Sequence, residues 1–133
     1  MWLLKTEPGE YSYDDLEDEK RGRWDGVSNP AALRNLRAMA KGDRVLVYHT
    51  GDEKAVVGTA EVVREAYPDP EGKNERLVVV DVEPRGRLAR PVTLAEIKQM
   101  PEFAESPLVR QGRLSVVPIT ATQWEAIDAR GRR

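Results

Sequence analysis

Four runs of β-branched residues constrain the fold of this chain more than any other feature of its sequence. They lie at 43–50, 55–64, 76–83 and 112–119, and each is bounded by Gly, Pro or Asp. Branched side chains pack well on a pleated surface, so such runs are typical of strands. The stretch from Trp2 to Lys5 adds a shorter first strand, and we expect a mostly antiparallel sheet.

Capping patterns predict helices between these strands. In a capping box, a Ser or Thr and a polar residue three positions later satisfy each other's free backbone amides. The boxes are Ser12 with Asp15, Thr93 with Glu96, and Thr122 with Glu125. They predict helices that run through about Lys20, at about 94–100 and at about 123–129. Short strands with helices inserted between them indicate an α+β fold built on a small barrel.

A further helix begins at Asn29, because Asn caps free amides and Pro30 loses no hydrogen bond at the first helical position. One side of this helix is basic, with no acid among Arg34, Arg37 and Lys41. These three residues are candidates for phosphate contacts; the alternative is an ordinary solvated face.

Composition excludes several classes of chemistry. Among the 133 residues there is no cysteine and a single histidine, so we expect no metal and no cofactor. With a net charge of −2, the chain lacks the positive electrostatic field of a protein that binds long stretches of phosphate backbone. The segment after Met1 is too short and too charged for a signal peptide or membrane span, so we expect a cytoplasmic protein.

Enzyme templates fit poorly. The sequence has no phosphate-binding glycine loop, no G-x-S-x-G, no H-E-x-x-H and no cysteine nucleophile. His49 is the one candidate for a near-neutral general base, with a structural hydrogen-bonding role as the alternative. Trp24 lies in a stretch without helical or strand periodicity, where a large aromatic side chain is either an anchor onto the core or a wall of a binding site.

Several motifs, in order over nearly the whole chain, resemble the EVE domain family. They are 2–8 (WLLKTEP), 24–29 (WDGVSN), 36–39 (LRAM), 42–43 (GD), 48–50 (YHT), 65–69 (EAYPD) and 113–116 (RLSV). Two departures stand out. Ser28 replaces the usual Arg, and the polar loop that follows the 65–69 motif is cut to 70–74.

The resemblance implies a single domain over 1–133, with a PUA-like, mostly antiparallel β-barrel of about five or six strands and short helices around it. Members of the family include small bacterial proteins. More distant relatives are the YTH domains, which bind methylated adenine in RNA. The implied function is non-catalytic: one base of DNA or RNA, expected to be modified, is held in an aromatic pocket. An indole that stacks on an extruded base contributes about 1–3 kcal/mol.

The resemblance also implies the residues of that pocket. Trp24 is the candidate stacking wall, and we expect it to expose a ring face. The pocket is expected between the first strand, the 22–29 segment and the strand that ends at His49. Its other candidates are Lys5, Thr6, Glu7, Asp25, Gly26, Val27 and Asn29, with Tyr48, His49 and Tyr67 as weaker ones.

Two alternatives stay open at this point. One is a general RNA-binding PUA-like module linked to translation or RNA modification, which would lose affinity steeply with salt and ignore the modification. The other is a hydrolase or nuclease that uses His49 and turns over its oligonucleotide.

Overall fold

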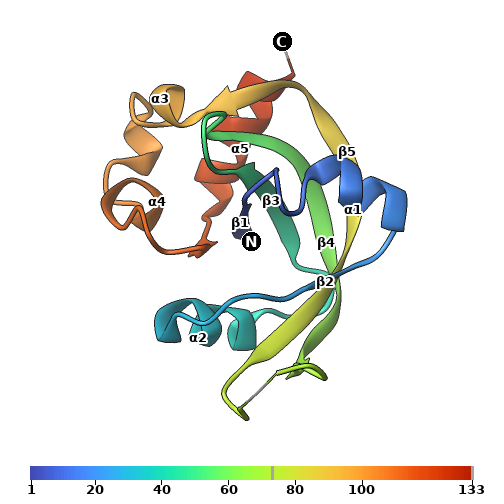
Figure 1. The fold of residues 1–133 in the computed structure, drawn as a ribbon. Helices are drawn as coiled ribbons and strands as arrows, with labels where there is room; N and C mark the ends of the chain where they lie inside the picture. Colours follow the sequence, from blue (N-terminus) through green and yellow to red (C-terminus); the bar gives the residue numbers. More distant parts are fainter. Residues whose placement is uncertain (73, 133) are drawn as a thin grey trace.

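A six-stranded sheet forms the centre of the computed structural model, which describes residues 1–72 and 74–132. The strand order is β2-β5-β4-β3-β1-β6, and the sheet curls into a half-barrel (Figure 1). The strands are β1 (Trp2–Thr6), β2 (Gly22–Trp24), β3 (Arg44–His49), β4 (Ala55–Pro68), β5 (Val78–Thr93) and β6 (Val116–Pro118). Only β1 and β3 pair in parallel within the described residues. The predicted α+β fold with a mostly antiparallel sheet is confirmed.

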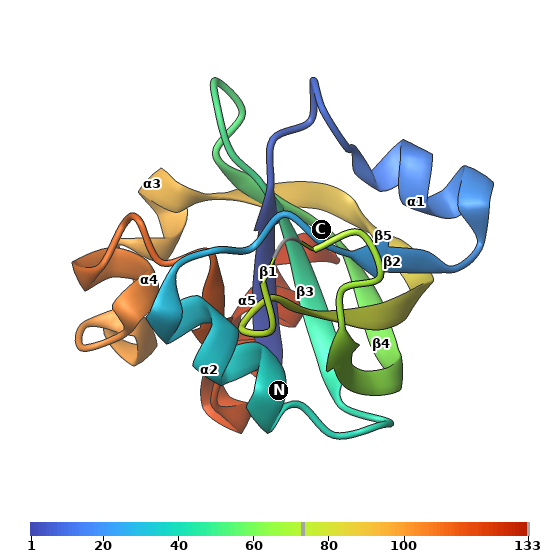
Figure 2. The ribbon, with the colours of Figure 1, turned by 60° about the horizontal axis from the view of Figure 1, so that its bottom comes forward.

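Helices pack around the curled sheet (Figure 2). They are α1 (Tyr13–Glu19), α2 (Pro30–Ala38), α3 (Leu94–Ile97), α4 (Pro107–Arg110) and α5 (Ala121–Gly131), with a 3₁₀ turn, η1 (Pro101–Phe103). The predicted caps at Ser12, Asn29 and Thr93 are confirmed. Within residues 1–72 and 74–132, the helices are too short or too polar to cross a bilayer.

The last helix begins two residues before its predicted start. Thr120 and Gln123, rather than Thr122 and Glu125, form its capping box. Both pairs fit the pattern, but Gln123 also donates from its side-chain amide to the carbonyl of Glu102, 2.9 Å away. That long-range bond selects the earlier cap, so the predicted box was wrong.

Two strands depart most from the sequence prediction, while β4 continues to Pro68 and β6 covers only Val116–Pro118 of the predicted 112–119. The 22–24 segment, interpreted as irregular, is strand β2, and it pairs with β5 so that Trp24 lies opposite Val80. Strand β5 continues ten residues beyond its predicted end, because β4 pairs with it as far as Thr93 through several bulges. Gly86 takes a positive φ of 138° along this bent stretch.

Tyr13 fastens α1 to the sheet. Its ring is fully buried, and its hydroxyl donates to the carbonyl of Thr59 (2.7 Å) and accepts from the backbone N–H of Gly86 (3.0 Å). The ring lies directly over Gly58, where a Cβ atom would come within 2.5 Å of it. This close approach requires glycine in the middle of β4.

We therefore expect Gly58→Ala to lower the free energy of unfolding by about 1–3 kcal/mol, the usual cost of overpacking. The Tyr13 ring cannot swing away without breaking its two hydroxyl bonds. Gly112→Ala is the matched control, because a Cβ there meets nothing within 4 Å, and it should change stability by less than about 0.5 kcal/mol. Equilibrium urea unfolding measures both, and equal stability of the two variants would contradict the role of Gly58.

Candidate functional site

A cavity of about 640 Å³ opens between the end of β1, the end of α1 and strand β2. Segments far apart in the sequence contribute its walls. The lining residues are Lys5, Thr6, Glu7, Glu10, Tyr11, Glu19, Arg21, Arg23, Trp24, Asp25, Gly26, Val27 and Ser115. Its volume lies in the range of small-molecule binding pockets.

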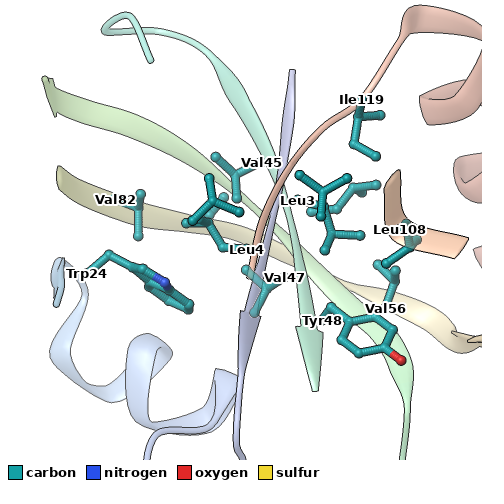
Figure 3. Close-up of a cluster of buried hydrophobic side chains, with 14 of the residues drawn as sticks. Leu3, Leu4, Trp24, Val45, Val47, Tyr48, Val56, Val82, Leu108 and Ile119 are labelled. Carbon is teal, nitrogen blue, oxygen red and sulfur yellow. The ribbon is translucent and has the colours of Figure 1, made fainter. Parts of the chain in front are cut away.

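The Trp24 indole lines this cavity but is almost entirely covered. Its exposed fraction is 5%, and Figure 3 shows the ring in the same cluster of buried side chains as Leu4 and Val82. The expected exposed ring face is therefore a misprediction. Pairing of β2 with β5 turns the indole inward, where it packs as part of the core.

Tyr11 is the second aromatic wall. Its ring meets the indole of Trp24 edge to face, with 5.8 Å between centroids and an interplanar angle of 85°. The hydroxyl donates to Glu19 Oε1 (2.5 Å), and the main-chain carbonyl accepts from Thr6 Oγ1 (2.6 Å). Burial, and then the bonded Glu19 carboxylate, raise the pKa of Tyr11 above its ordinary value, so the hydroxyl stays protonated.

Gly22 allows Tyr11 to take this position. A Cβ at Gly22 would lie 2.6 Å from the Tyr11 hydroxyl oxygen and 2.8 Å from Leu16. Sequence reasoning missed Tyr11, because α1 brings Glu19 to it and the turn after α1 brings Trp24 to it only in the folded chain.

The three cations that line the cavity each have a protein partner. The guanidinium of Arg21 is paired with Asp81 (3.1 Å), and that of Arg23 with Glu71 (2.9 Å). The ammonium of Lys5 donates to the carbonyl of Gly112 (2.9 Å), and burial lowers the pKa of Lys5.

The carboxylates of the cavity are freer than its cations. Within the described residues, the side chains of Glu7, Glu10 and Asp25 accept no protein hydrogen bond, whereas Glu19 is bonded to Tyr11. The hydrogen-bonding capacity left open in this cavity is therefore mostly that of acceptors.

Comparison with known proteins identifies the family. The model of the EVE domain matches residues 1–129. This chain belongs to the EVE domain family. The NMR structure of Rpa0253 from Rhodopseudomonas palustris is similar to this EVE domain at 40% identity and a TM-score of 0.91, over 98% of this chain and 91% of that one.

A human relative has been solved with nucleic acid. Human thymocyte nuclear protein 1 (THYN1) is 29% identical over 95% of this EVE domain and 71% of its own length. A crystal structure of human THYN1 in complex with 5-methylcytosine-containing DNA matches with a TM-score of 0.87 at 28% identity, over 99% of this chain and 97% of that one.

The fold extends beyond the family. The ASCH domain of Zymomonas mobilis matches with a TM-score of 0.61 at 14% identity, over 96% of this chain and 93% of that one. This likeness concerns the fold alone, and with the curled sheet it confirms the predicted PUA-like architecture.

Three predicted site residues of this EVE domain lie outside the cavity. Asn29 caps α2, where its side chain accepts from the N–H groups of the first helical turn. Tyr48 lines a separate groove beside Lys5. The hydroxyl of Tyr67 donates to Asp81 (2.5 Å), and Arg64 lies over its ring.

His49 also lies outside the cavity, and both of its ring nitrogens are engaged. Nε2 accepts the backbone N–H of Tyr13 (3.0 Å), which places the ring hydrogen on Nδ1, where it donates to Glu53 (2.7 Å). The side chain is 6% exposed. This geometry corresponds to a structural hydrogen-bonding residue.

The residues predicted to contact phosphate are all exposed, two of them on α2 and the third, Lys41, after its end. Arg37 donates to the carbonyl of Arg76 (2.5 Å), and the backbone N–H of Lys41 donates to Glu65 (3.1 Å). Arg34 is exposed. None of the three lines the cavity.

We expect His49→Ala to lower the free energy of unfolding by about 1–3 kcal/mol, because the buried N–H of Tyr13 loses its acceptor. His49→Gln keeps an acceptor and should cost less. Thermal or urea unfolding of the two variants checks this expectation. Equal losses would mean that the ring's packing, rather than its hydrogen bonds, stabilises α1.

Proposed function

We propose that this EVE domain is a non-catalytic nucleic-acid-binding module that holds a single modified base in the cavity between β1, α1 and β2. The observation that carries the proposal is the cavity itself, in which an aromatic wall faces carboxylates without protein partners. The complex of human THYN1 with 5-methylcytosine DNA supports it. We infer a base extruded from its strand, because a stacked base could not reach these walls.

Tyr11, more than Trp24, supplies the aromatic surface in this proposal. Its ring is half-buried, whereas Trp24 is 95% covered in this conformation. Stacking on an aromatic ring is worth about 1–3 kcal/mol per base. Trp24 supports Tyr11 through the edge-to-face contact.

The carboxylates favour a base with an amino group on its edge. Asp and Glu side chains accept hydrogen bonds from an exocyclic amine such as the N4 group of cytosine. Asp25 and Glu7 are the candidates for this role, because both face the cavity and keep free acceptor oxygens. Thr6, Lys5, Gly26 and Val27 complete the proposed pocket.

Both alternative functions have less support. The nitrogens of His49 are occupied and lie outside the cavity, which disfavours a hydrolase built on that residue. Four carboxylates in the cavity repel phosphate groups and so disfavour a module that binds RNA without base selectivity through its phosphates. DNA or RNA with a modified base remains the proposed partner, and the cytoplasm the expected location.

Asp25→Asn tests the proposed base contact. If Asp25 accepts a hydrogen bond from the base, the loss of a charge-assisted bond of about 1.5–3 kcal/mol weakens binding about ten- to 150-fold. Glu125→Gln, an exposed change on α5 away from the cavity, is the control and should bind as wild type. Fluorescence anisotropy with short single strands of DNA and RNA, with 5-methylcytosine or cytosine at one position, gives the affinities.

The intactness of each strand after long incubation tests the absence of catalysis. Cleavage or base release that His49→Gln abolishes would overturn the non-catalytic assignment, and equal binding of modified and unmodified strands would overturn the base selectivity. Trp24→Ala is a poor test, because emptying a core position of this size costs about 3–5 kcal/mol of stability.

A further inference from the structure

Two shallow grooves lie beside the cavity, on either side of a ridge formed by residues 111–115. The first groove, of about 170 Å³, is lined by Lys5, Tyr48, Lys54 and Gly112 among others. The second groove, of about 300 Å³, is lined by Asn29, Gln111, Gly112 and Arg113 among others. Gly112 therefore lies between the two grooves, and Lys5 lies between the first groove and the cavity.

Lys5 holds the ridge against the sheet. Its backbone N–H donates to the carbonyl of Ser115 (3.0 Å), and its ammonium donates to the carbonyl of Gly112 (2.9 Å). Ser115 also lines the cavity. The cavity and both grooves thus share one fixed wall and form a continuous surface.

Acidic residues are absent from the walls of both grooves among the described residues. The cavity, by contrast, has four carboxylates, in a chain that has 23 acidic and 21 basic residues. The cavity therefore combines four carboxylates with three cations, two of which are ion-paired, whereas the charged residues of the grooves are all cations.

The groove cations are also unpaired. Lys54 and Arg113 are exposed, and neither forms an ion pair in residues 1–72 and 74–132. By contrast, eight arginines do form ion pairs: Arg21, Arg23, Arg85, Arg87, Arg90, Arg110, Arg130 and Arg132. Lys54 and Arg113 therefore keep their charge available for an anion.

We propose that the ridge and its two grooves bind the sugar–phosphate backbone on both sides of the captured base, with Lys54 and Arg113 contacting phosphates. This inference rests on the proposed function. Carboxylates in the cavity repel phosphate, so a strand enters it with the base first. The neighbouring phosphates then lie on the adjoining surface, where acids are absent and two cations are free.

The basic stripe on α2 is the competing surface. Arg34, Arg37 and Lys41 line neither the cavity nor the two grooves. Arg37 is already bonded to a main-chain carbonyl. Continuity with the cavity favours the ridge.

The double variant Lys54→Gln/Arg113→Gln tests this inference. With two single-strand phosphate contacts removed, the slope of log affinity against log salt should become shallower by about 1.4, and affinity at 0.1 M salt should fall about 25-fold. Modified and unmodified strands should weaken by the same factor. Arg85→Gln, in a separate hollow beside α5, and the triple Gln variant of the α2 stripe are the controls and should keep the wild-type slope.

Gly112→Glu is an independent test that does not remove a cation. A side chain there meets nothing within 4 Å, so the fold accommodates a carboxylate on the ridge. Gly112→Glu should weaken binding of all strands, whereas Glu125→Gln, an exposed change on α5 away from the ridge, should bind as wild type. Urea unfolding verifies that each variant is folded.

The outcomes separate this inference from the proposed function. If the double variant and Gly112→Glu keep wild-type affinity and slope while base selectivity persists, the phosphate surface is overturned and the base pocket stands. If the stripe variant alone flattens the slope, phosphates bind at α2. If wild type binds no strand, both proposals fail.

Discussion

The Tyr13 side chain is the contact on which the cavity depends. Its ring lies on Gly58, its hydroxyl bridges two strands, and its backbone N–H is held by His49. These bonds fix α1 against the sheet, and α1 in turn positions Glu19 and the entry into β2. The wall of the cavity that contains Tyr11 therefore depends on a buried ring whose close approach to the sheet requires glycine at position 58.

Separation of charge is the second organising feature. A net charge of −2 indicates no broad attraction to nucleic acid, and most arginines are neutralised by neighbouring acids. Around the cavity, among the described residues, carboxylates without protein partners line the cavity itself, and two cations without ion pairs, Lys54 and Arg113, line the grooves beside it. In the proposed binding mode, the cavity discriminates between bases, and the ridge adds affinity that is independent of sequence and sensitive to salt.

The sequence predicts those structural features that depend on interactions between residues close together in the chain. Capping at Ser12, Asn29 and Thr93 could be identified because each cap involves residues two or three positions apart. Strand β2 could not, because its three residues form a strand only against β5, more than 50 positions away. The burial of Trp24 follows from that pairing. The residues from Lys5 to Glu7 and from Trp24 to Val27 do meet in one cavity, but Tyr11 and Ser115 join them only in three dimensions.

The way Tyr11 is held bears on how a small modification could be distinguished. A buried methyl group adds only about 0.8 kcal/mol, so selectivity in the proposed pocket must come from a shape that does not adapt to the wrong base. Tyr11 is held by its hydrogen bonds to Glu19 and Thr6 and by the edge-to-face contact with Trp24, and a Cβ at Gly22 would lie 2.6 Å from its hydroxyl oxygen. A wall held by three neighbours is already ordered before a base arrives. In the proposed binding mode, this rigidity turns a difference of one methyl group into a difference in fit.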